Sequence, residues 1–314
     1  MPTNPRRMSW AEVPDAVVAR IEGRAGSAVA SAAGSEFGFS PGFAGVVNFA
    51  DGSRVFLKVM SGVRDPWSIA MNRREVEVLS VLPSEISAPA LLWTVEEGDW
   101  LVLAAEAVEG EHPRPAENPH HAAAIWDGLS HLATVRAPAN LPAFHDYQAD
   151  VFTQWATLAE APDRAERIAT FGGHGEWIAE HLDDLVAWER EGIEVSKGDA
   201  LVHGDLRDDN LLLVGERLMI VDWPHASRGA PWIDLVGYLP SFEMFGGGIA
   251  SEAFRAHPLS KGVTGAEERA LVAGLAGYFT VGATDPPMPA LPGLREFQRA
   301  QAVPALNWLR RLAD

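Results

Sequence analysis

Three oxygen-bearing side chains stand at the ends of two short apolar runs near the middle of the chain. Asp205 and Asn210 precede the run 211–214, and Asp222 follows the run 217–221. Only two residues separate the runs, which predicts a hairpin whose outer ends lie close together. A carboxylate, an amide oxygen and a second carboxylate would then converge, and such hard oxygen ligands suit Mg²⁺ that bridges phosphates. A cluster of Asx turns at loop ends is the alternative interpretation.

A lysine interrupts an apolar strand nearer the N-terminus. Val55, Leu57 and Val59 would share one face of this strand, and Phe56 and Lys58 the other. A charged amine among apolar neighbours needs an opposite charge or an anionic ligand. An outward-facing strand lysine is the alternative.

These residues need elements that position them, and the first hundred residues or so indicate a small lobe of sheet and helix. Ser9 and Glu12 have the spacing of a capping box, with an amphipathic helix following to about Glu22. Asp51-Gly52 between apolar runs is typical of a hairpin turn. The expected strands are 28–32, 43–50, 53–60, 90–95 and 100–105, and a second helix is expected over 66–82.

The rest of the chain reads as mostly helical. Proline becomes frequent at Pro113, Pro115 and Pro119, where the strand pattern ends. We therefore expect two lobes, residues 1–108 and 109–314. The expected helices are 120–136, 150–168, 174–190, 232–239, 265–280 and 294–312, with a short β interruption over 199–222.

Composition narrows the function classes. The chain has 314 residues, no cysteine and a net charge of −18. The acidic charge argues against nucleic acid or anionic lipid as a partner and is compatible with a cationic substrate. Because the longest apolar stretch, 271–283, is shorter than the roughly 20 residues that span a bilayer, we expect no membrane partner and a cytoplasmic location.

The segment around Asp205 resembles a known family. His203-Gly204-Asp205, followed by Asn210 and then by a hairpin that ends in Ile-Val-Asp222-Trp, is similar to the aminoglycoside phosphotransferase and choline kinase family. The resemblance extends over about 27–312 and is strongest at 201–236. It implies an α+β, bilobal protein-kinase-like fold, with a small β-rich N-lobe and a larger, mostly helical C-lobe.

The resemblance also implies roles for the residues of this segment. Asp205 would be the catalytic carboxylate that accepts or orients the proton of the acceptor hydroxyl. Asn210 and Asp222 would hold Mg²⁺. Arg207 stands where many protein kinases have a lysine, and we expect it to neutralise charge on the transferred phosphoryl group. An ion pair of Arg207 with Asp208 or Asp209 is the alternative.

Nucleotide binding is assigned by the same resemblance to the first lobe. Lys58 would contact the α- and β-phosphates of ATP, with Glu75 as its partner, while Glu77 would point to water. The connector from Glu106 to Val108 would bind adenine through backbone groups. A plain linker is the alternative for this connector.

A glycine-containing loop, 38–44, precedes Lys58. Its backbone N–H groups could cover the phosphates, with Ser40, Gly42 and Phe43 as the predicted contacts. Pro41 supplies no N–H, and the spacing is not the usual Gly-x-Gly-x-x-Gly. An ordinary turn is therefore an equally good interpretation.

Other residues of the second lobe have structural or acceptor-site interpretations. His203 would brace the catalytic loop, and Asp234 would clamp its backbone. The acceptor site is expected over the helix from Ala149, the segment 242–248 and the C-terminal helices. Its acidic candidates are Asp150, Glu160, Asp234 and Glu243, and its tryptophans are better explained as core.

The sequence thus predicts an ATP- and Mg²⁺-dependent kinase that phosphorylates a hydroxyl of a small molecule. The acceptor stays open among an antibiotic, an aminosugar and a metabolite such as choline or homoserine. A kinase-like nucleotide-binding regulator without turnover is the alternative. A protein kinase is third, because the short stretch from Asp222 to Asp234 leaves little room for an activation loop.

Overall fold

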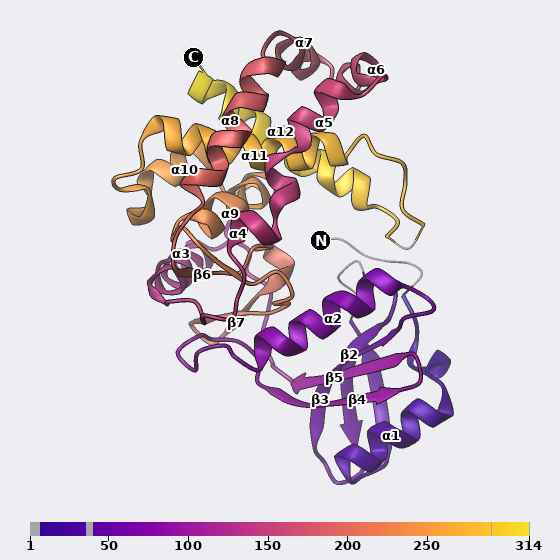
Figure 1. The fold of residues 1–314 in the computed structure, drawn as a ribbon. Helices are drawn as coiled ribbons and strands as arrows, with labels where there is room; N and C mark the ends of the chain where they lie inside the picture. Colours follow the sequence, from indigo (N-terminus) through magenta and orange to yellow (C-terminus); the bar gives the residue numbers. More distant parts are fainter. Residues whose placement is uncertain (1–6, 36–39, 290, 314) are drawn as a thin grey trace. The chain divides into compact units, whose positions relative to one another are not determined.

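The computed structural model describes residues 7–35, 40–289 and 291–313 (Figure 1). The chain divides into two compact units, and each is discontinuous in sequence. The first unit consists of Met1–His112, Asp209–His225 and Pro287–Leu294, and the second consists of Pro113–Asp208, Ala226–Pro286 and Arg295–Asp314. Asn210 and Asp222 therefore belong to the same unit as Lys58, whereas Asp205 belongs to the other.

The first unit is built on a five-stranded antiparallel sheet with the strand order β1-β2-β3-β5-β4 (Figure 1). Its strands are Val29–Gly34 (β1), Phe43–Phe49 (β2), Arg54–Ser61 (β3), Leu91–Glu97 (β4) and Trp100–Glu106 (β5). The β2–β3 turn forms at Asp51-Gly52, where Gly52 has a φ of 87°. This left-handed conformation favours glycine, which is why the Asp-Gly pair predicts the hairpin correctly.

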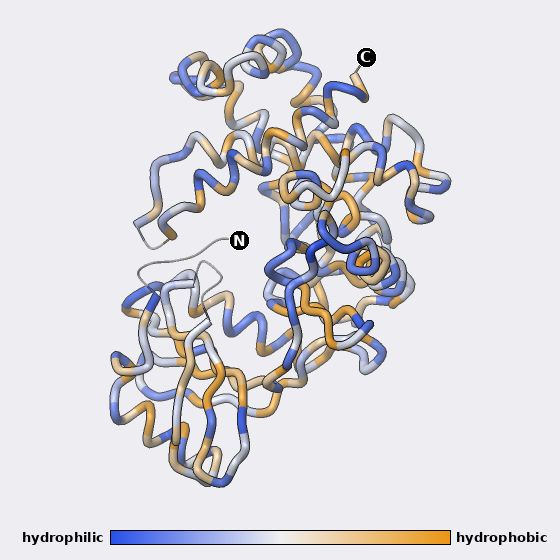
Figure 2. Tube along the Cα trace, turned by 180° about the vertical axis from the view of Figure 1, so that it is seen from behind, coloured by the Kyte–Doolittle hydropathy of each residue, from blue (hydrophilic) through white to orange (hydrophobic). Residues whose placement is uncertain are grey.

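The core of this unit lies on one face of β3. Val55, Leu57 and Val59 alternate as buried residues along the strand and share a cluster with Val17 and Ile21. The last two come from helix α1 (Asp15–Ala25), which begins later than the sequence suggests, since the capping-box residues form a separate short 3₁₀ turn. Hydrophobic residues recur along the strands of the sheet in Figure 2.

Helix α2 (Pro66–Leu79) follows β3 directly. It begins as the sequence predicts: Asp65 caps it by accepting a hydrogen bond from the Trp67 N–H, and Pro66 occupies the first turn. It ends at Leu79 rather than at residue 82. Glu75 lies on its buried side.

A hairpin of β7 (Leu211–Val214) and β8 (Arg217–Ile220) completes the described core of this unit. Leu213 exchanges two backbone hydrogen bonds with Glu111, and the Ile220 N–H donates to the Ser87 carbonyl at 2.8 Å. These bonds join the hairpin to the segment before β4 and to the segment after β5.

The second unit is mostly helical. Its helices of seven residues or more are Pro119–Thr134 (α3), Gln154–Glu160 (α5), Gly173–Glu180 (α7), Leu182–Val195 (α8), Ile233–Met244 (α9), Ala250–Ala256 (α10), Gly265–Gly282 (α11) and Leu294–Ala313 (α12). Strands β6 (Ala200–Val202) and β9 (Ser227–Gly229) pair beside them. Helices α8 and α11 approach closely because Gly192 and Gly274 leave room for the Phe152 ring.

Two predicted helices are wrong in their extent. The stretch 150–168 breaks into a 3₁₀ turn, α5 and a short helix Arg164–Ala169 (α6), since Ala161 before Pro162 takes an extended conformation. The stretch 174–190 breaks at His181. The new helix α8 carries Asp183 and Asp184 in its first turn, where acidic side chains are favourable. The sequence interpretation also missed α10 and β9.

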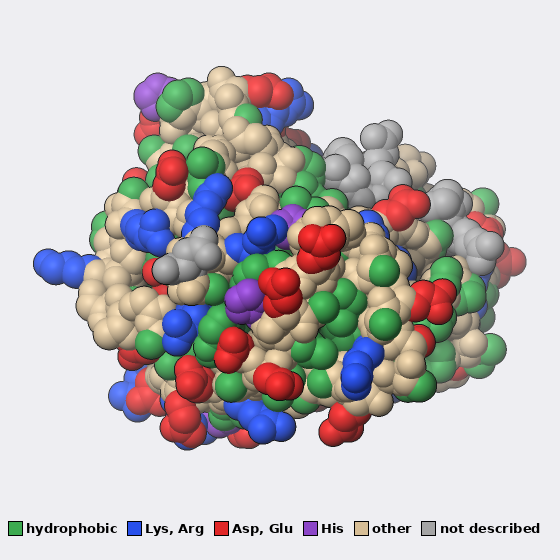
Figure 3. Space-filling view, turned by 90° about the horizontal axis from the view of Figure 1, so that it is seen from above, with side chains coloured by type: hydrophobic (Ala, Val, Ile, Leu, Met, Phe, Trp, Pro, Cys, Tyr) green, Lys and Arg blue, Asp and Glu red, His purple; other side chains and the backbone are tan. Residues whose placement is uncertain are grey.

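Within the described ranges, no helix has both the length and the apolar character needed to cross a membrane. Acidic and basic side chains are interspersed over the face shown in Figure 3.

Candidate active site

The charged centre of the first unit is formed by one cation between two carboxylates. The Lys58 Nζ lies 2.6 Å from the Glu75 Oε2 and 2.6 Å from the Asp222 Oδ1. β3, α2 and the end of the β7–β8 hairpin each supply one of the three. The predicted Lys58–Glu75 ion pair is confirmed, and Glu77 is largely exposed, as expected.

Burial and the neighbouring charges shift the pKa values of this centre in opposite directions. Burial alone would lower the pKa of Lys58, but the carboxylates of Asp222 and Glu75 outweigh it and hold the pKa above its ordinary value. Burial raises the pKa of Glu75, and the lysine opposes that effect. The lysine therefore stays charged, and its two partners hold it in one place.

The two predicted metal ligands stand at neighbouring ends of one hairpin. Leu211 pairs with Ile220, and the Val221 N–H donates to the Asn210 carbonyl at 2.9 Å. Asp222 follows directly with a φ of 68°, a left-handed conformation that is rare outside glycine. Strain of this kind, on the order of 1–3 kcal/mol, persists where the surrounding structure fixes a functional side chain.

The donor set fits a nucleotide-bound Mg²⁺. Such an ion keeps several waters and takes one or two protein oxygens together with phosphate oxygens. Asn210 offers an amide oxygen and Asp222 a partly exposed carboxylate. In the part of the chain that the structure describes, no group of three or more His, Asp or Glu side chains is arranged to hold a metal ion.

The predicted phosphate loop is described from Ser40 onward, and its residues 38 and 39 lie outside the described residues. The Ser40 hydroxyl donates to the Met60 sulfur at 3.3 Å. A Cβ on Gly42 would lie 2.5 Å from the Val59 carbonyl oxygen, so this glycine is required for the backbone to approach β3. The Phe43 side chain is buried in the core, which leaves only its backbone for a ligand.

The connector after β5 keeps fewer groups for adenine than the sequence suggests. The Glu106 N–H donates to the Ala90 carbonyl at 2.9 Å, so that donor is occupied. Arg54 pairs with Glu109 and donates to the Ala107 carbonyl, which fixes the chain on both sides of Val108. The adenine role of Glu106 and Val108 stays a prediction.

The charged pair of the second unit is formed within the predicted catalytic loop. The Arg207 Nη1 lies 2.7 Å from both carboxylate oxygens of Asp205. The Arg207 guanidinium also lies over the Phe297 ring, 5.6 Å from its centroid. This ion pair to Asp205 is not one that the sequence interpretation considered.

Asp234 clamps the backbone of the same loop, as predicted. Its carboxylate accepts hydrogen bonds from the His203 N–H at 2.7 Å and the Gly204 N–H at 2.9 Å. Burial raises the pKa of Asp234 to about 6, Asp205 adds to this effect, and the two N–H groups oppose it. The Asp205 N–H in turn lies 3.3 Å from the His203 Nδ1.

Sequence reasoning missed a further anchor of the loop and the electrostatic link of Tyr278 to it. Asp208 is buried and accepts hydrogen bonds from Tyr238 at 3.0 Å and Ser241 at 2.8 Å. The spacing of that tyrosine and serine, on one face of α9, is the signal that could have found them. Burial, together with the Asp205 and Asp150 carboxylates, raises the pKa of Tyr278 to about 12.

The candidate acceptor residues differ in what they do. Trp155 and Trp308 are fully buried and fill the core, as the sequence favoured. The Glu243 carboxylate accepts a hydrogen bond at 2.7 Å from the N–H of Ala250, the first residue of α10. Asp150 remains an acceptor-site candidate.

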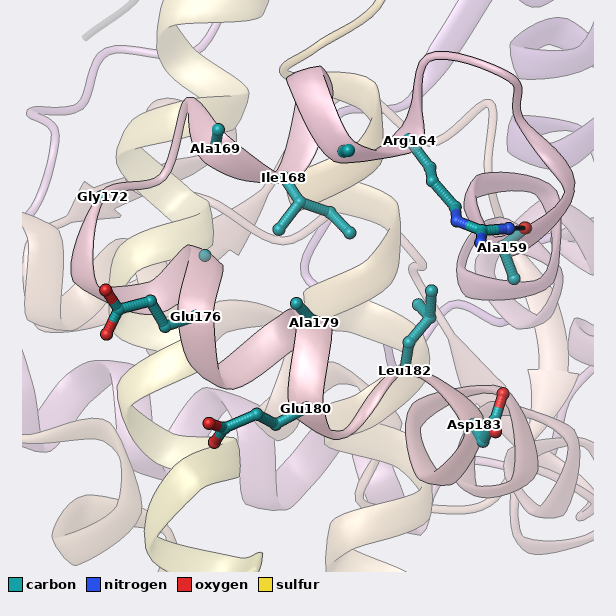
Figure 4. A pocket seen from close by; sticks show the side chains of 12 residues that line it. Ala159, Arg164, Ile168, Ala169, Gly172, Glu176, Ala179, Glu180, Leu182 and Asp183 are labelled. Atoms are coloured by element: carbon teal, nitrogen blue, oxygen red, sulfur yellow. Dashed lines mark hydrogen bonds between the residues drawn. The ribbon is translucent and has the colours of Figure 1, made fainter.

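A hollow of about 750 Å³ lies elsewhere in the second unit, among α5, α6, α7 and α8 (Figure 4). Small residues form much of its lining, with Glu176, Glu180 and Asp183 among the polar side chains. It contains none of the predicted site residues.

The chain belongs to the phosphotransferase enzyme family. The sequence model of this family, APH, described as "Phosphotransferase enzyme family", matches residues 46–272, which is well over half of the chain. No curated protein matches the chain significantly. The predicted family resemblance is confirmed, and the matched region includes Lys58, Asp205 and Asp222.

Solved structures confirm the predicted kinase-like fold. A thermostable mutant of aminoglycoside phosphotransferase APH(4)-Ia, in ternary complex with ADP and hygromycin B, is similar with a TM-score of 0.59 at 15% identity, covering 95% of this chain and 97% of that one. Choline kinase LicA from Streptococcus pneumoniae has a TM-score of 0.57 at 13% identity and covers 95% and 97%. A choline/ethanolamine kinase family protein from Mesorhizobium loti has a TM-score of 0.56 at 17% identity and covers 95% and 93%.

Proposed function

We propose that this phosphotransferase uses MgATP to phosphorylate a hydroxyl group of a small molecule. The observation that carries the proposal is the Lys58 amine held between Glu75 and Asp222. A fixed, charged lysine beside a carboxylate that can bind Mg²⁺ is what phosphate binding in a kinase requires.

The residues of the first unit would bind and orient the nucleotide. Lys58 donates to the α- and β-phosphates, and Glu75 keeps the amine in position. Asn210 and Asp222 would hold Mg²⁺, which supplies charge neutralisation on the β- and γ-phosphate oxygens. The backbone from Ser40 to Gly42 lies against β3 and can donate N–H groups to phosphate except at its proline.

The residues of the second unit would act on the acceptor. The acceptor oxygen forms a bond to the γ-phosphorus while the bond from that phosphorus to the bridging oxygen of ADP breaks. Asp205 accepts the proton that the acceptor hydroxyl loses. Asp234 fixes the loop backbone that carries this carboxylate, and Arg207 holds both of its oxygens in one orientation.

The acceptor is proposed only as a small hydroxylated molecule, with a cationic one favoured by the net charge of −18. The test is ADP release with MgATP and a panel of aminoglycosides, aminosugars, choline and homoserine, with the phosphorylated product identified by mass spectrometry. Turnover of an aminoglycoside would point to a role in antibiotic resistance. An Asp222→Ala variant serves as the matched control and should lose MgATP binding.

A nucleotide-binding protein without turnover is the second candidate. The ion pair of Arg207 with Asp205 favours it, because the Arg207 Nη1 engages both oxygens of the proposed base. Binding of MgATP by the wild-type protein without ADP release on any acceptor would support this second candidate against the first.

A further inference from the structure

Arg7, a cation near the N-terminus, belongs to the first unit and forms no ion pair with any described residue. Arg7 precedes Met8, which is buried in the sheet core and whose N–H donates to the Pro41 carbonyl at 2.9 Å. Two residues further on, the Trp10 ring packs edge-on against Phe43, with centroids 5.1 Å apart. These contacts fix the segment 7–10 against the start of β2.

The Arg7 side chain bridges the two ends of the β1–β2 loop. Its Nε donates to the Ser40 carbonyl at 3.3 Å, and its Nη1 donates to the Ser35 carbonyl at 3.1 Å. Both acceptors are neutral. Among the described residues Arg7 forms no ion pair, and its Nη2 donates to none of them. A half-buried guanidinium that forms no ion pair with the described residues is unusual in a chain with 43 acidic residues.

The carboxylate that acts on Arg7 is Asp222. Burial lowers the pKa of Arg7, and the negative charge of Asp222 opposes that effect. The same carboxylate is the ion-pair partner of Lys58 and a predicted ligand of Mg²⁺. Asp222 thus acts electrostatically on both cations, and of the two it forms an ion pair with Lys58.

The Ser40 end of the β1–β2 loop, to which Arg7 donates, lies at the same end of β3 as Lys58. Ala44 pairs with Lys58 in the β2–β3 register, and the backbone at Gly42 packs against Val59 and Met60. Because Pro41 has no N–H, this loop has one donor fewer for phosphate. A guanidinium presents several N–H donors in a planar fork that matches phosphate oxygens and keeps its charge at every physiological pH.

We propose that Arg7 is a further phosphate-binding residue, whose guanidinium contacts the β- and γ-phosphate oxygens of MgATP while it donates to the Ser35 and Ser40 carbonyls. This inference rests on the proposed function. It adds to the lysine of β3 a second cation, supplied by the segment that precedes the sheet. A residue that only fastened the loop would affect the whole nucleotide site and would not distinguish phosphate from nucleoside.

That distinction gives the experiment. The dissociation constants of MgATP and of adenosine are measured by calorimetry for the wild type and for Arg7→Gln, Arg7→Lys and Arg20→Gln. Arg20 is the matched control, since it is an exposed arginine of the same unit that pairs with Glu97 at 3.2 Å. Melting temperatures show whether each variant is folded.

Arg7→Gln should weaken MgATP binding by about tenfold or more, as expected for the loss of charge-assisted hydrogen bonds, and change adenosine binding less than about twofold. Arg7→Lys keeps the charge and should retain part of the MgATP affinity, which makes it the second test if the glutamine variant is unstable. Arg20→Gln should resemble the wild type in both measurements.

Two results would overturn the inference: unchanged MgATP affinity in Arg7→Gln, or equal losses for MgATP and adenosine in both Arg7 variants. Failure of the wild type to bind MgATP contradicts the proposed function itself. Normal MgATP binding in the wild type and in Arg7→Gln, together with a loss in Lys58→Met, contradicts only the role of Arg7.

Discussion

The two units position their charged groups in different ways. In the first unit, Lys58 lies between Glu75 and Asp222, and each residue comes from a different element. In the second unit, Asp205 and Arg207 are two residues apart on one loop, and a buried carboxylate, Asp234, fixes the backbone of that loop. Side-chain ion pairs position the first centre, and backbone hydrogen bonds position the second.

The difference matches what each centre is proposed to do. A phosphate-binding amine must be charged and fixed before the ligand arrives, so it is buried between two carboxylates. A carboxylate that accepts a proton must stay accessible to its substrate, and so its loop is fixed from behind. Removing a charge should therefore damage nucleotide binding in the first unit and turnover in the second.

The largest expected effect is on turnover. Asp205→Asn keeps the shape of the loop but removes the proton acceptor, and kcat should fall by a factor on the order of 10²–10⁴ while the Kd of MgATP stays nearly unchanged. Steady-state kinetics with the true acceptor and calorimetry measure the two quantities. Asp199→Asn, an exposed aspartate that pairs with Arg136 in the same unit, is the control. Wild-type turnover in Asp205→Asn would show that the catalytic assignment is wrong.

In the first unit, Lys58→Met should raise the Kd or KM of MgATP by about 10- to 100-fold, because a charge-assisted contact to phosphate is lost. The fold should survive, since Glu75 can take up a proton once its cation is gone. Nucleotide titration with melting temperature as a check tests this. Full activity of the variant would remove the main support for nucleotide binding at this lysine.

The clamp in the second unit predicts a pH dependence of stability. The pKa of Asp234 is raised to about 6, above its ordinary value near 4. The charged form is therefore disfavoured in the folded state, which lowers the free energy of unfolding. This loss of stability is absent below pH 4, grows between pH 4 and pH 6, and is constant above pH 6. Two pKa units correspond to about 3 kcal/mol in the free energy of unfolding.

Urea unfolding of the wild type and of Asp234→Asn at pH 4.5 and 7.5 isolates this contribution, because asparagine does not titrate. The wild type should gain stability relative to the variant as the pH falls. An identical pH dependence in the two proteins would contradict the raised pKa.

The smallest expected effect distinguishes two glutamates of α2. Glu75→Gln keeps Lys58 in place but holds it less firmly, so the KM of MgATP should rise by about three- to tenfold. Glu77→Gln should be neutral within about twofold, since its side chain is exposed and pairs only with Arg74 among the residues described. A damaging Glu77→Gln beside a silent Glu75→Gln would reverse the assignment of the helix face.

Local patterns were sufficient for much of this protein. Alternation along β3 predicted that Val55, Leu57 and Val59 share one face of the strand, and the Asp-Gly turn predicted its hairpin, because both depend on neighbours in sequence. The spacing from His203 to Asn210 predicted the family, which the family match confirms. The helices that the sequence placed wrongly fail at Pro162 and His181, where a local break outweighs a continuing apolar pattern.

What the sequence by itself determined was the set of chemical groups and the family to which they belong: a lysine in an apolar strand, a loop with an aspartate and an asparagine, and an aspartate after a hairpin. Only the tertiary structure decided that Asp222 shares Lys58 with Glu75, and that Arg7 donates to the carbonyls of Ser35 and Ser40, 28 and 33 residues away. Such partners are set by folding of the chain over long sequence separations, and by burial that forces each charge to find a partner. Neither effect is visible in a local pattern.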